Sequence, residues 1–200
     1  MRTTAFMLVL SAMALAGCDT AELNTPDPDA SNTEAGNGAP VPMAGEPGAV
    51  QLSAEGLTVT GPLGTTLPFD TARATVEAEL TKFVGAPLRR GSNAECGAGP
   101  VDTTAFHGGL TLNFQKDTFA GWEYEGDRKN DISTDIATDK GIDIGATETE
   151  LIAAYGENKQ SDSTLGVEFF SENGVGGFLG GDVADRTVTS LYAGVTCFFR

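Results

Sequence analysis

Two stretches of this chain carry the same order of local signals, a helix followed by a β-hairpin, and this repetition constrains the fold more than any other feature. In the second stretch, residues 147–150 (TETE) form a capping box, in which the first threonine and the last glutamate satisfy each other's backbone amides. Apolar residues at helical spacing follow until Gly156, which ends the helix. A hairpin is predicted next, over 166–178, with its turn at Asn173-Gly174, a dipeptide that tolerates positive φ.

The first stretch repeats this order with a longer helix and a longer connector. A helix is predicted over 72–84, with Asp70 or Thr71 as its N-cap and Gly85 as its stop. The hairpin that follows spans 109–122. The two hairpins align as GLTLNF…FxGW against GVEFF…VxGF. This similarity predicts a duplicated helix-plus-hairpin unit, and the alternative is that two small α+β stretches look alike by chance.

Further apolar segments flank the helices and hairpins and are candidate strands. They comprise residues 52–59, 132–144, 188–192 and 195–199. A helix buries one stripe and a half-buried sheet buries one face, so the simplest arrangement places both helices on the same side of one sheet. We therefore predict an α+β domain over 50–200, with repeats at about 50–126 and 132–200. Its expected form is a curved antiparallel sheet with two helices packed on one face.

The first eighteen residues combine a positive charge, an apolar stretch and a cysteine. Arg2 provides a positive charge, and residues 5–16 form an apolar stretch that is too short to span a bilayer but suits a cleavable signal peptide over 1–17. The motif LAGC at 15–18 resembles the bacterial lipobox, which implies cleavage before Cys18 and its acylation. Two or three acyl chains anchor a protein stably. The alternative is a buried N-terminal helix, which the polar residues after Cys18 disfavour.

Asp19, next to the acylated cysteine, resembles the retention signal of enteric bacteria and favours the inner membrane over the outer one. Residues 18–49 hold five prolines, six acidic residues and no Lys or Arg. Such a segment buries too little apolar surface to offset the entropy of ordering, so we expect a disordered linker. The alternative is a peptide motif that a partner binds. Together these features predict a lipid-anchored protein of the cell envelope that faces the periplasm.

The net charge restricts the partners of this chain. It has 28 acidic and 12 basic residues, and a net charge of −16. Nucleic-acid phosphates and anionic lipids select clusters of Lys and Arg, so we expect no nucleic-acid partner and no membrane binding through charge. The expected contacts are the membrane, through the acyl chains, and another envelope protein.

Cys96 and Cys197 remain once Cys18 is acylated, and they form an even pair in an oxidising compartment. We expect a disulfide between them. Two alternatives stay open, namely two free structural thiols and a nucleophile–base pair of Cys96 with His107, the only histidine. Because no third group is marked to orient that pair, we expect no enzyme activity and no catalytic residue. A hydrolase that uses His107 is the enzymatic alternative.

The acidic loop at 127–143 has carboxylates at the spacing of a calcium-binding loop. However, Ile136 stands where that loop needs glycine, and Ile142 stands where it needs a bidentate glutamate. A solvated loop is therefore expected, and a small-ligand or calcium-binding lipoprotein is the alternative function. The glycine-rich run at 173–181 lacks the third glycine and the Lys-Ser/Thr of nucleotide-binding loops. We expect no metal and no cofactor.

The segment GIDIGATETELIAAYG at 141–156, together with the hairpin after it, resembles the repeat of the β-lactamase-inhibitor-protein-like superfamily. That superfamily includes the BamE-type small lipoproteins of the β-barrel assembly machinery. The second half of the chain also resembles an uncharacterised group of bacterial periplasmic lipoproteins that end in a Cys-containing strand. The resemblance implies the tandem fold. It implies no binding residue, because the contact residues of the inhibitor have no matching motif in this sequence.

The leading hypothesis is a tethered protein-binding or scaffold module, because the sequence combines an anchor, a linker, a repeat and no coherent catalytic set. Proteins of the resembled superfamily use the sheet face opposite the helices for partners. The aromatic residues from which such a face can be built are Trp122, Tyr124, Phe178, Phe198 and Phe199. Trp122 and Tyr124 are the first candidates for the interaction surface, and the alternative is that they belong to the core.

Overall fold

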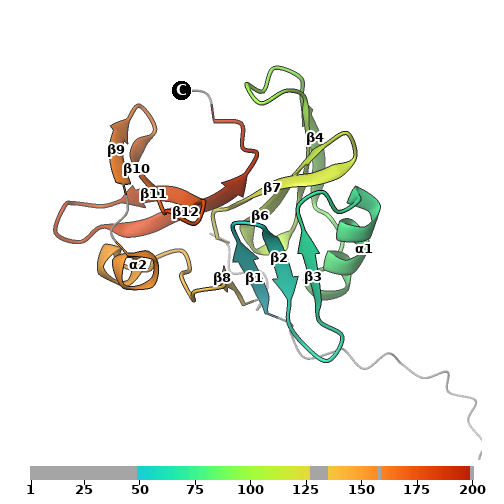
Figure 1. Ribbon diagram of the computed structural model, residues 1–200, viewed down its shortest axis with the longest axis horizontal. Coiled ribbons are helices and arrows are strands. Elements are labelled where there is room, and N and C mark those ends of the chain that lie inside the picture. Colours follow the sequence, from blue (N-terminus) through green and yellow to red (C-terminus); the bar gives the residue numbers. More distant parts are fainter. Residues whose placement is uncertain (1–48, 127–134, 157–158, 199–200) are drawn as a thin grey trace, which may run out of the picture. The chain divides into compact units, whose positions relative to one another are not determined.

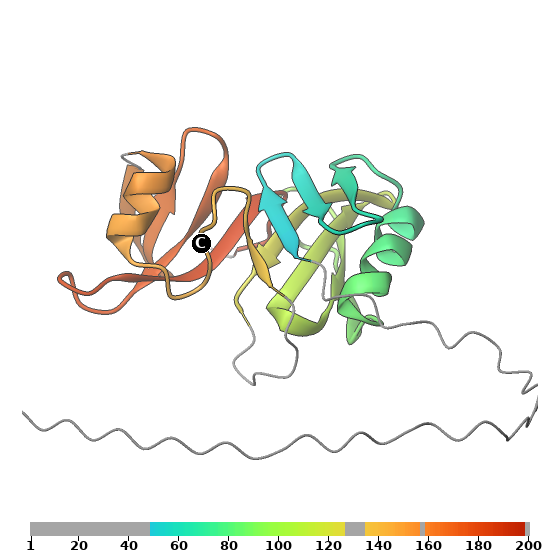
Figure 2. The ribbon, with the colours of Figure 1, turned by 90° about the horizontal axis from the view of Figure 1, so that it is seen from below.

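Two β-sheets and two α-helices make up the folded part of this chain (Figures 1 and 2). The computed structural model describes residues 49–126, 135–156 and 159–198, and of 159–163 it describes the backbone alone. The expected signal peptide at 1–17 and nearly all of the expected linker at 18–49 lie outside the described residues. The predicted α+β class is confirmed.

A small mixed sheet is built around a hairpin at the start of the domain. Strands β1 (Val50–Ser53) and β2 (Gly56–Val59) pair antiparallel. Strand β3 (Thr65–Pro68) lies beside β2, and β8 (Ile136–Thr138) runs parallel to β1 on its other side (Figure 2). The sequence predicts one strand at 52–59 and a single antiparallel sheet. The structure has a second sheet because residues 52–59 fold back as a hairpin, which β8 joins from far along the chain.

The large sheet has eight strands, each antiparallel to its neighbours, in the order β4-β5-β6-β7-β12-β11-β10-β9. The strands are β4 (Arg89–Asn93), β5 (Val101–Ala105), β6 (Leu110–Gln115), β7 (Thr118–Tyr124), β9 (Lys159–Ser163), β10 (Gly166–Phe170), β11 (Val175–Gly180) and β12 (Thr187–Gly194). A short 3-10 helix, His107–Gly109, connects β5 to β6.

Both predicted hairpins are present in the large sheet. Strands β6 and β7 join through Lys116 and Asp117, whose φ angles of 52° and 60° suit the twist of a tight hairpin. Strands β10 and β11 join through a turn that contains Gly174, with a φ of 94°. The predicted strand at 188–192 lies within β12, whereas residues 195–198 of the predicted terminal strand form no strand.

Both predicted helices are present and end at the predicted glycines, Gly85 and Gly156. They are α1 (Arg73–Val84), which packs near β7, and α2 (Glu148–Tyr155), which packs near β12 (Figure 1). The capping box of α2 is confirmed, because the Glu150 amide lies 3.2 Å from Thr147 Oγ1 and the Thr147 amide lies 2.8 Å from Glu150 Oε2. No helix among the described residues is long and apolar enough to cross a membrane.

The predicted N-cap of α1 is wrong. The N-cap residue is Ala72, and no side chain caps this helix. The amide of Asp70 donates to the Phe119 carbonyl at 2.8 Å, and the hydroxyl of Thr71 donates to the Pro68 carbonyl at 2.7 Å. These contacts with β7 and β3 hold the two predicted cap residues away from the helix amides.

One apolar core joins the two sheets and the two helices. Its fully buried members include Leu52 and Leu57 of the small sheet, Leu80 of α1, Leu151 of α2, and Leu112, Trp122, Phe169 and Leu191 of the large sheet. Burial of such side chains supplies the main favourable contribution to folding. Both halves of the large sheet therefore depend on the same core.

An ion-pair network fixes α1 to the edge of the large sheet. Glu77 Oε1 accepts hydrogen bonds from Arg73 Nε at 2.9 Å and from Thr104 Oγ1 at 2.7 Å. Its Oε2 accepts a bond from the Arg90 guanidinium at 2.7 Å. Partial burial disfavours the charged carboxylate, but the hydrogen bonds from these three residues outweigh it and lower the pKa of Glu77 to about 2. The charged form of Glu77 therefore stabilises the fold.

We predict that Glu77→Gln lowers the free energy of unfolding by about 2 kcal/mol at neutral pH, because it removes a charged acceptor from its donors. A carboxyl whose pKa falls on folding stabilises the protein above its unfolded value of 4.5 and loses this contribution as the pH falls towards 2. The difference between the two proteins in urea unfolding should therefore shrink as the pH is lowered.

The matched control is Glu79→Gln, because Glu79 bonds to Lys82 on the exposed side of the same helix. Surface pairs of this kind contribute little, so we expect a change below about 0.5 kcal/mol. A Glu77→Gln difference that stays constant between neutral and acidic pH would contradict this account of the network.

Candidate functional site

Trp122 and Tyr124, the first candidates for an interaction surface, are buried in the core, so this prediction is wrong. Trp122 is fully buried, and its indole N–H donates to the Ser53 carbonyl of β1 at 2.8 Å. Tyr124 is also buried, and its hydroxyl donates to Asp143 Oδ1 at 2.8 Å. Burial and the Asp143 carboxylate raise the pKa of Tyr124.

Glu123 lies between these two residues on β7, so its side chain faces the opposite side of the large sheet. Residues that pair directly across antiparallel strands share a face. Tyr192 of β12 pairs with Glu123, and Gly176 of β11 pairs with Tyr192. We call this side of the sheet, opposite the core, the outer face.

Four aromatic rings gather on the outer face, and we call them the aromatic cluster. They are Phe170 of β10, Phe178 of β11, Tyr192 of β12, and Phe198 of the chain beyond β12. The ring centre of Phe198 lies 5.0 Å from that of Tyr192 and 5.3 Å from that of Phe178, and both contacts are edge-on. Phe170 is 36% exposed, and Phe178 and Phe198 are partly exposed, so the cluster reaches the surface.

Glu168 and Gly176 set the position of the Tyr192 ring. The Tyr192 hydroxyl donates to Glu168 Oε1 at 2.5 Å, and both side chains are buried. A Cβ atom on Gly176 would lie 2.6 Å from two atoms of the Tyr192 ring, so the ring can lie against β11 only because this residue is glycine. The buried hydrogen bond and the close packing therefore hold the Tyr192 ring in one position, and the other rings of the aromatic cluster pack against it.

The chain beyond β12, residues 195–198, crosses the outer face, and we call it the C-terminal segment. Its Val195 amide donates to the Ala120 carbonyl at 2.8 Å, and its Val195 carbonyl accepts a bond from Asn113 Nδ2 at 2.9 Å. A Cβ atom on Gly121 would clash with the Val195 backbone, so the segment lies directly on β7. The expected disulfide between Cys96 and Cys197 is present and joins the segment to the β4–β5 loop.

Glu123 also holds the C-terminal segment. The Asn113 amide group donates to Glu123 Oε1 at 3.0 Å, and the backbone amide of Cys197 bonds to the same carboxylate. Burial raises the pKa of Glu123, and the nearby Glu125 adds to this rise, while the bonds from Asn113 and Cys197 oppose it. One carboxylate therefore links β6, β7 and the segment.

The disulfide excludes a catalytic pair of Cys96 with His107 in this oxidised protein, because Cys96 has no free thiol. His107 lies in the 3-10 helix before β6, beside Gly85 at the end of α1. Cys96 and His107 are 11 positions apart in the sequence. In the structure, Cys96 forms a disulfide and His107 lies beside the end of α1.

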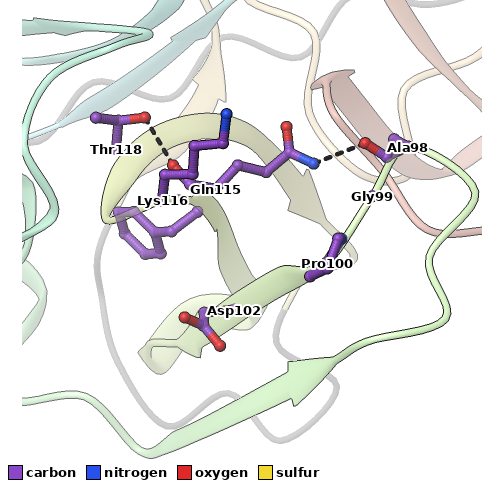
Figure 3. A pocket seen from close by; sticks show the side chains of 8 residues that line it. Ala98, Gly99, Pro100, Asp102, Gln115, Lys116 and Thr118 are labelled. Atoms are coloured by element: carbon purple, nitrogen blue, oxygen red, sulfur yellow. Dashed lines mark hydrogen bonds between the residues drawn. The ribbon is translucent and has the colours of Figure 1, made fainter.

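A pocket of about 480 Å³ lies between the β4–β5 loop and the turn that joins β6 to β7 (Figure 3). Its lining residues are Ala98, Gly99, Pro100, Asp102, Phe114, Gln115, Lys116 and Thr118. Gln115 donates to the Ala98 carbonyl at 2.8 Å, Thr118 donates to the Gln115 carbonyl at 2.8 Å, and Asp102 lies 3.5 Å from Arg73. The bonds of Gln115 and Thr118 hold the loop and the hairpin in place.

The acidic loop at 127–143 is described only from residue 135, because 127–134 lie outside the described residues. Asp143 accepts bonds from Tyr124 and from the Ile144 amide, and Asp139 lies 3.5 Å from the Tyr155 hydroxyl. Within the described ranges, no group of three or more His, Cys, Asp or Glu side chains is placed to hold a metal ion. The calcium alternative stays a prediction.

Known protein families, curated proteins and solved structures were compared with this chain. No protein-family model matches this chain, and no curated protein matches it. Among solved structures, the uncharacterized protein yfeY from Escherichia coli is similar, with 15% sequence identity and a TM-score of 0.45. The match covers 72% of this chain and 97% of that one.

We predict that Gly176→Ala destabilises the domain by about 1–3 kcal/mol, because the added methyl group pushes the Tyr192 ring away from β11. Chemical unfolding followed by fluorescence measures this change. Gly97→Ala is the matched control, since a Cβ atom there meets nothing within 4 Å, and we expect a change within about 0.5 kcal/mol. Equal stability of the two variants would show that the ring is not held as described.

Proposed function

We propose that this protein is a lipid-anchored module of the bacterial cell envelope that binds another envelope protein through the outer face. The observation that carries the proposal is the aromatic cluster. Its rings pack against one another on the sheet, and Phe170, Phe178 and Phe198 are partly exposed to solvent. Aromatic side chains, Phe among them, are enriched in protein–protein interfaces, and a few such side chains commonly supply much of the binding energy.

The net charge of the chain bears on the chemistry of the partner. The chain as a whole carries a net charge of −16. We therefore propose a partner surface that combines apolar side chains with Lys or Arg, since opposite charge steers association and adds specificity.

The proposal includes the tether. The LAGC motif supports acylation of Cys18, the following segment supports a linker to the domain, and Asp19 supports retention at the periplasmic side of the inner membrane. Anchoring by acyl chains leaves the acidic domain free to meet a neighbouring envelope protein without binding the lipid surface itself.

We also infer an internal duplication that is larger than a helix with one hairpin. Helix α1 precedes β4–β7 and α2 precedes β9–β12, and each set of four consecutive antiparallel strands ends at the central β7–β12 pair. The residue before α1, Ala72, bridges to Thr118 at the start of β7, and the residue before α2, Thr147, bridges to Thr187 at the start of β12. These features support a match of β6–β7 with β11–β12, in place of the hairpin alignment that the sequence predicts.

The binding surface can be tested by placing the photo-crosslinker benzoylphenylalanine at Phe170 in cells. We expect one discrete adduct with another envelope protein. Val183, which is 78% exposed in the loop before β12, is the matched control position and should give no such adduct. With the partner identified, Phe170→Ala should weaken binding by about tenfold or more, while Val183→Ala changes it little. The same adduct from both positions, or none from Phe170, would contradict the proposal.

The anchor can be tested by metabolic labelling with a palmitate analogue. We expect the wild type to be labelled and to fractionate with membranes, and Cys18→Ala to lose both properties. The Cys96→Ala/Cys197→Ala variant is the control and should keep the label, because it leaves the lipobox intact. A Cys18→Ala protein that is still labelled would rule out this anchor.

A further inference from the structure

We propose that the Cys96–Cys197 disulfide is a redox latch for the outer face, so that partner binding depends on the oxidised state. In the oxidised protein the latch holds the C-terminal segment on the sheet, and Phe198 completes the aromatic cluster. Reduction releases the segment and removes Phe198 from the cluster. The inference rests on the proposed function, because it concerns the regulation of the same face.

The first support is that the C-terminal segment lies outside the strands and outside the buried core. Residues 195–198 follow β12, are not part of a strand, and are not among the buried core residues. All four of these residues are partly exposed. A disulfide between two core strands constrains a whole fold, whereas this disulfide ends on a segment that lies on the outer face and outside the core.

The second support is the difference between the two ends of the disulfide. On the Cys96 side, two hydrogen bonds hold the β4–β5 loop independently of the disulfide. Gln115 donates to the Ala98 carbonyl, and Asn93 accepts a bond from the Glu95 amide. On the Cys197 side, the segment is held by the Val195 bonds to Ala120 and Asn113 and by the Glu123 carboxylate. Loss of the disulfide therefore leaves the loop in place, and it leaves the segment with the hydrogen bonds of Val195 and Cys197.

The third support is that Phe198 depends on the segment for its place. Its ring contacts Phe178 and Tyr192, which both belong to strands of the sheet. When the segment leaves, these two rings stay on the sheet and lose the ring that packs edge-on against both. The cluster then lacks one of the surfaces with which it binds its partner.

The chemistry requires a reductant, for which we propose a protein dithiol. One thiolate of the reductant attacks Cys197 Sγ, because Cys197 is partly exposed while Cys96 is buried. The Cys96–Cys197 bond breaks, Cys96 leaves as a thiolate, and a mixed disulfide forms with Cys197. The second thiol of the reductant then displaces Cys197. The reductant ends as a disulfide, and two electrons and two protons end on Cys96 and Cys197.

The test is hydrogen–deuterium exchange of the full-length protein in detergent, before and after treatment with dithiothreitol. We expect the amides of Val195 and Cys197 to exchange about tenfold faster or more after reduction, while the amides of β7 and β12 keep their protection. The Cys96→Ser/Cys197→Ser variant should show the fast pattern with or without dithiothreitol. Segment amides that stay protected would overturn the latch, and so would loss of protection across β7 and β12, which would make the disulfide a staple of the whole fold.

Crosslinking from position 170 in the oxidised and reduced states separates the latch from the proposed function. An adduct that forms only in the oxidised protein supports the latch. Equal adduct yields in both states overturn the latch and leave the proposed function standing. If neither state gives an adduct, the proposed function fails together with any control of binding by the disulfide, even when the exchange experiment shows a released segment.

Discussion

The pairing of β7 with β12 is the constraint on which the rest of the structure depends. It joins the two halves of the large sheet, with Tyr124 opposite Leu191 and Trp122 opposite Ala193 on the core face. The residues between them, Glu123 and Tyr192, are thereby placed together on the outer face. A slip of one residue would exchange the two faces, because side chains alternate along a strand. The core, the aromatic cluster and the surface under the C-terminal segment therefore follow from one register.

The features that local signals encode could be predicted from the sequence. The helix ends at Gly85 and Gly156, the capping box of α2 and the turns of both hairpins each depend on a few neighbouring residues, and the structure contains all of them. The disulfide could also be predicted, because Cys96 and Cys197 are the two cysteines that remain when Cys18 is acylated. The N-cap of α1 could not be predicted, because contacts with β3 and β7 fix Asp70 and Thr71.

The features that depend on distant pairing could not be predicted. Nothing in residues 136–138 indicates a parallel partner in β1, so the small sheet was missed. The alternation of β7 shows that Trp122 and Tyr124 share a face, but it does not show which face is covered. The small sheet decides this, because the Trp122 indole donates to Ser53 of β1, and the outer face is left to Glu123. Phe178 and Phe198 were among the aromatic residues named from the sequence, and they do reach the outer face.

The central claim is that the outer face of the oxidised protein carries a cluster that the C-terminal segment completes. Nuclear Overhauser contacts between aromatic side chains test it most directly. The account predicts cross-peaks from the Phe198 ring to both Phe178 and Tyr192, and no cross-peak from Phe198 to Trp122, which lies on the core face. Cross-peaks between Phe198 and Trp122, or the absence of any between Phe198 and Tyr192, would contradict it.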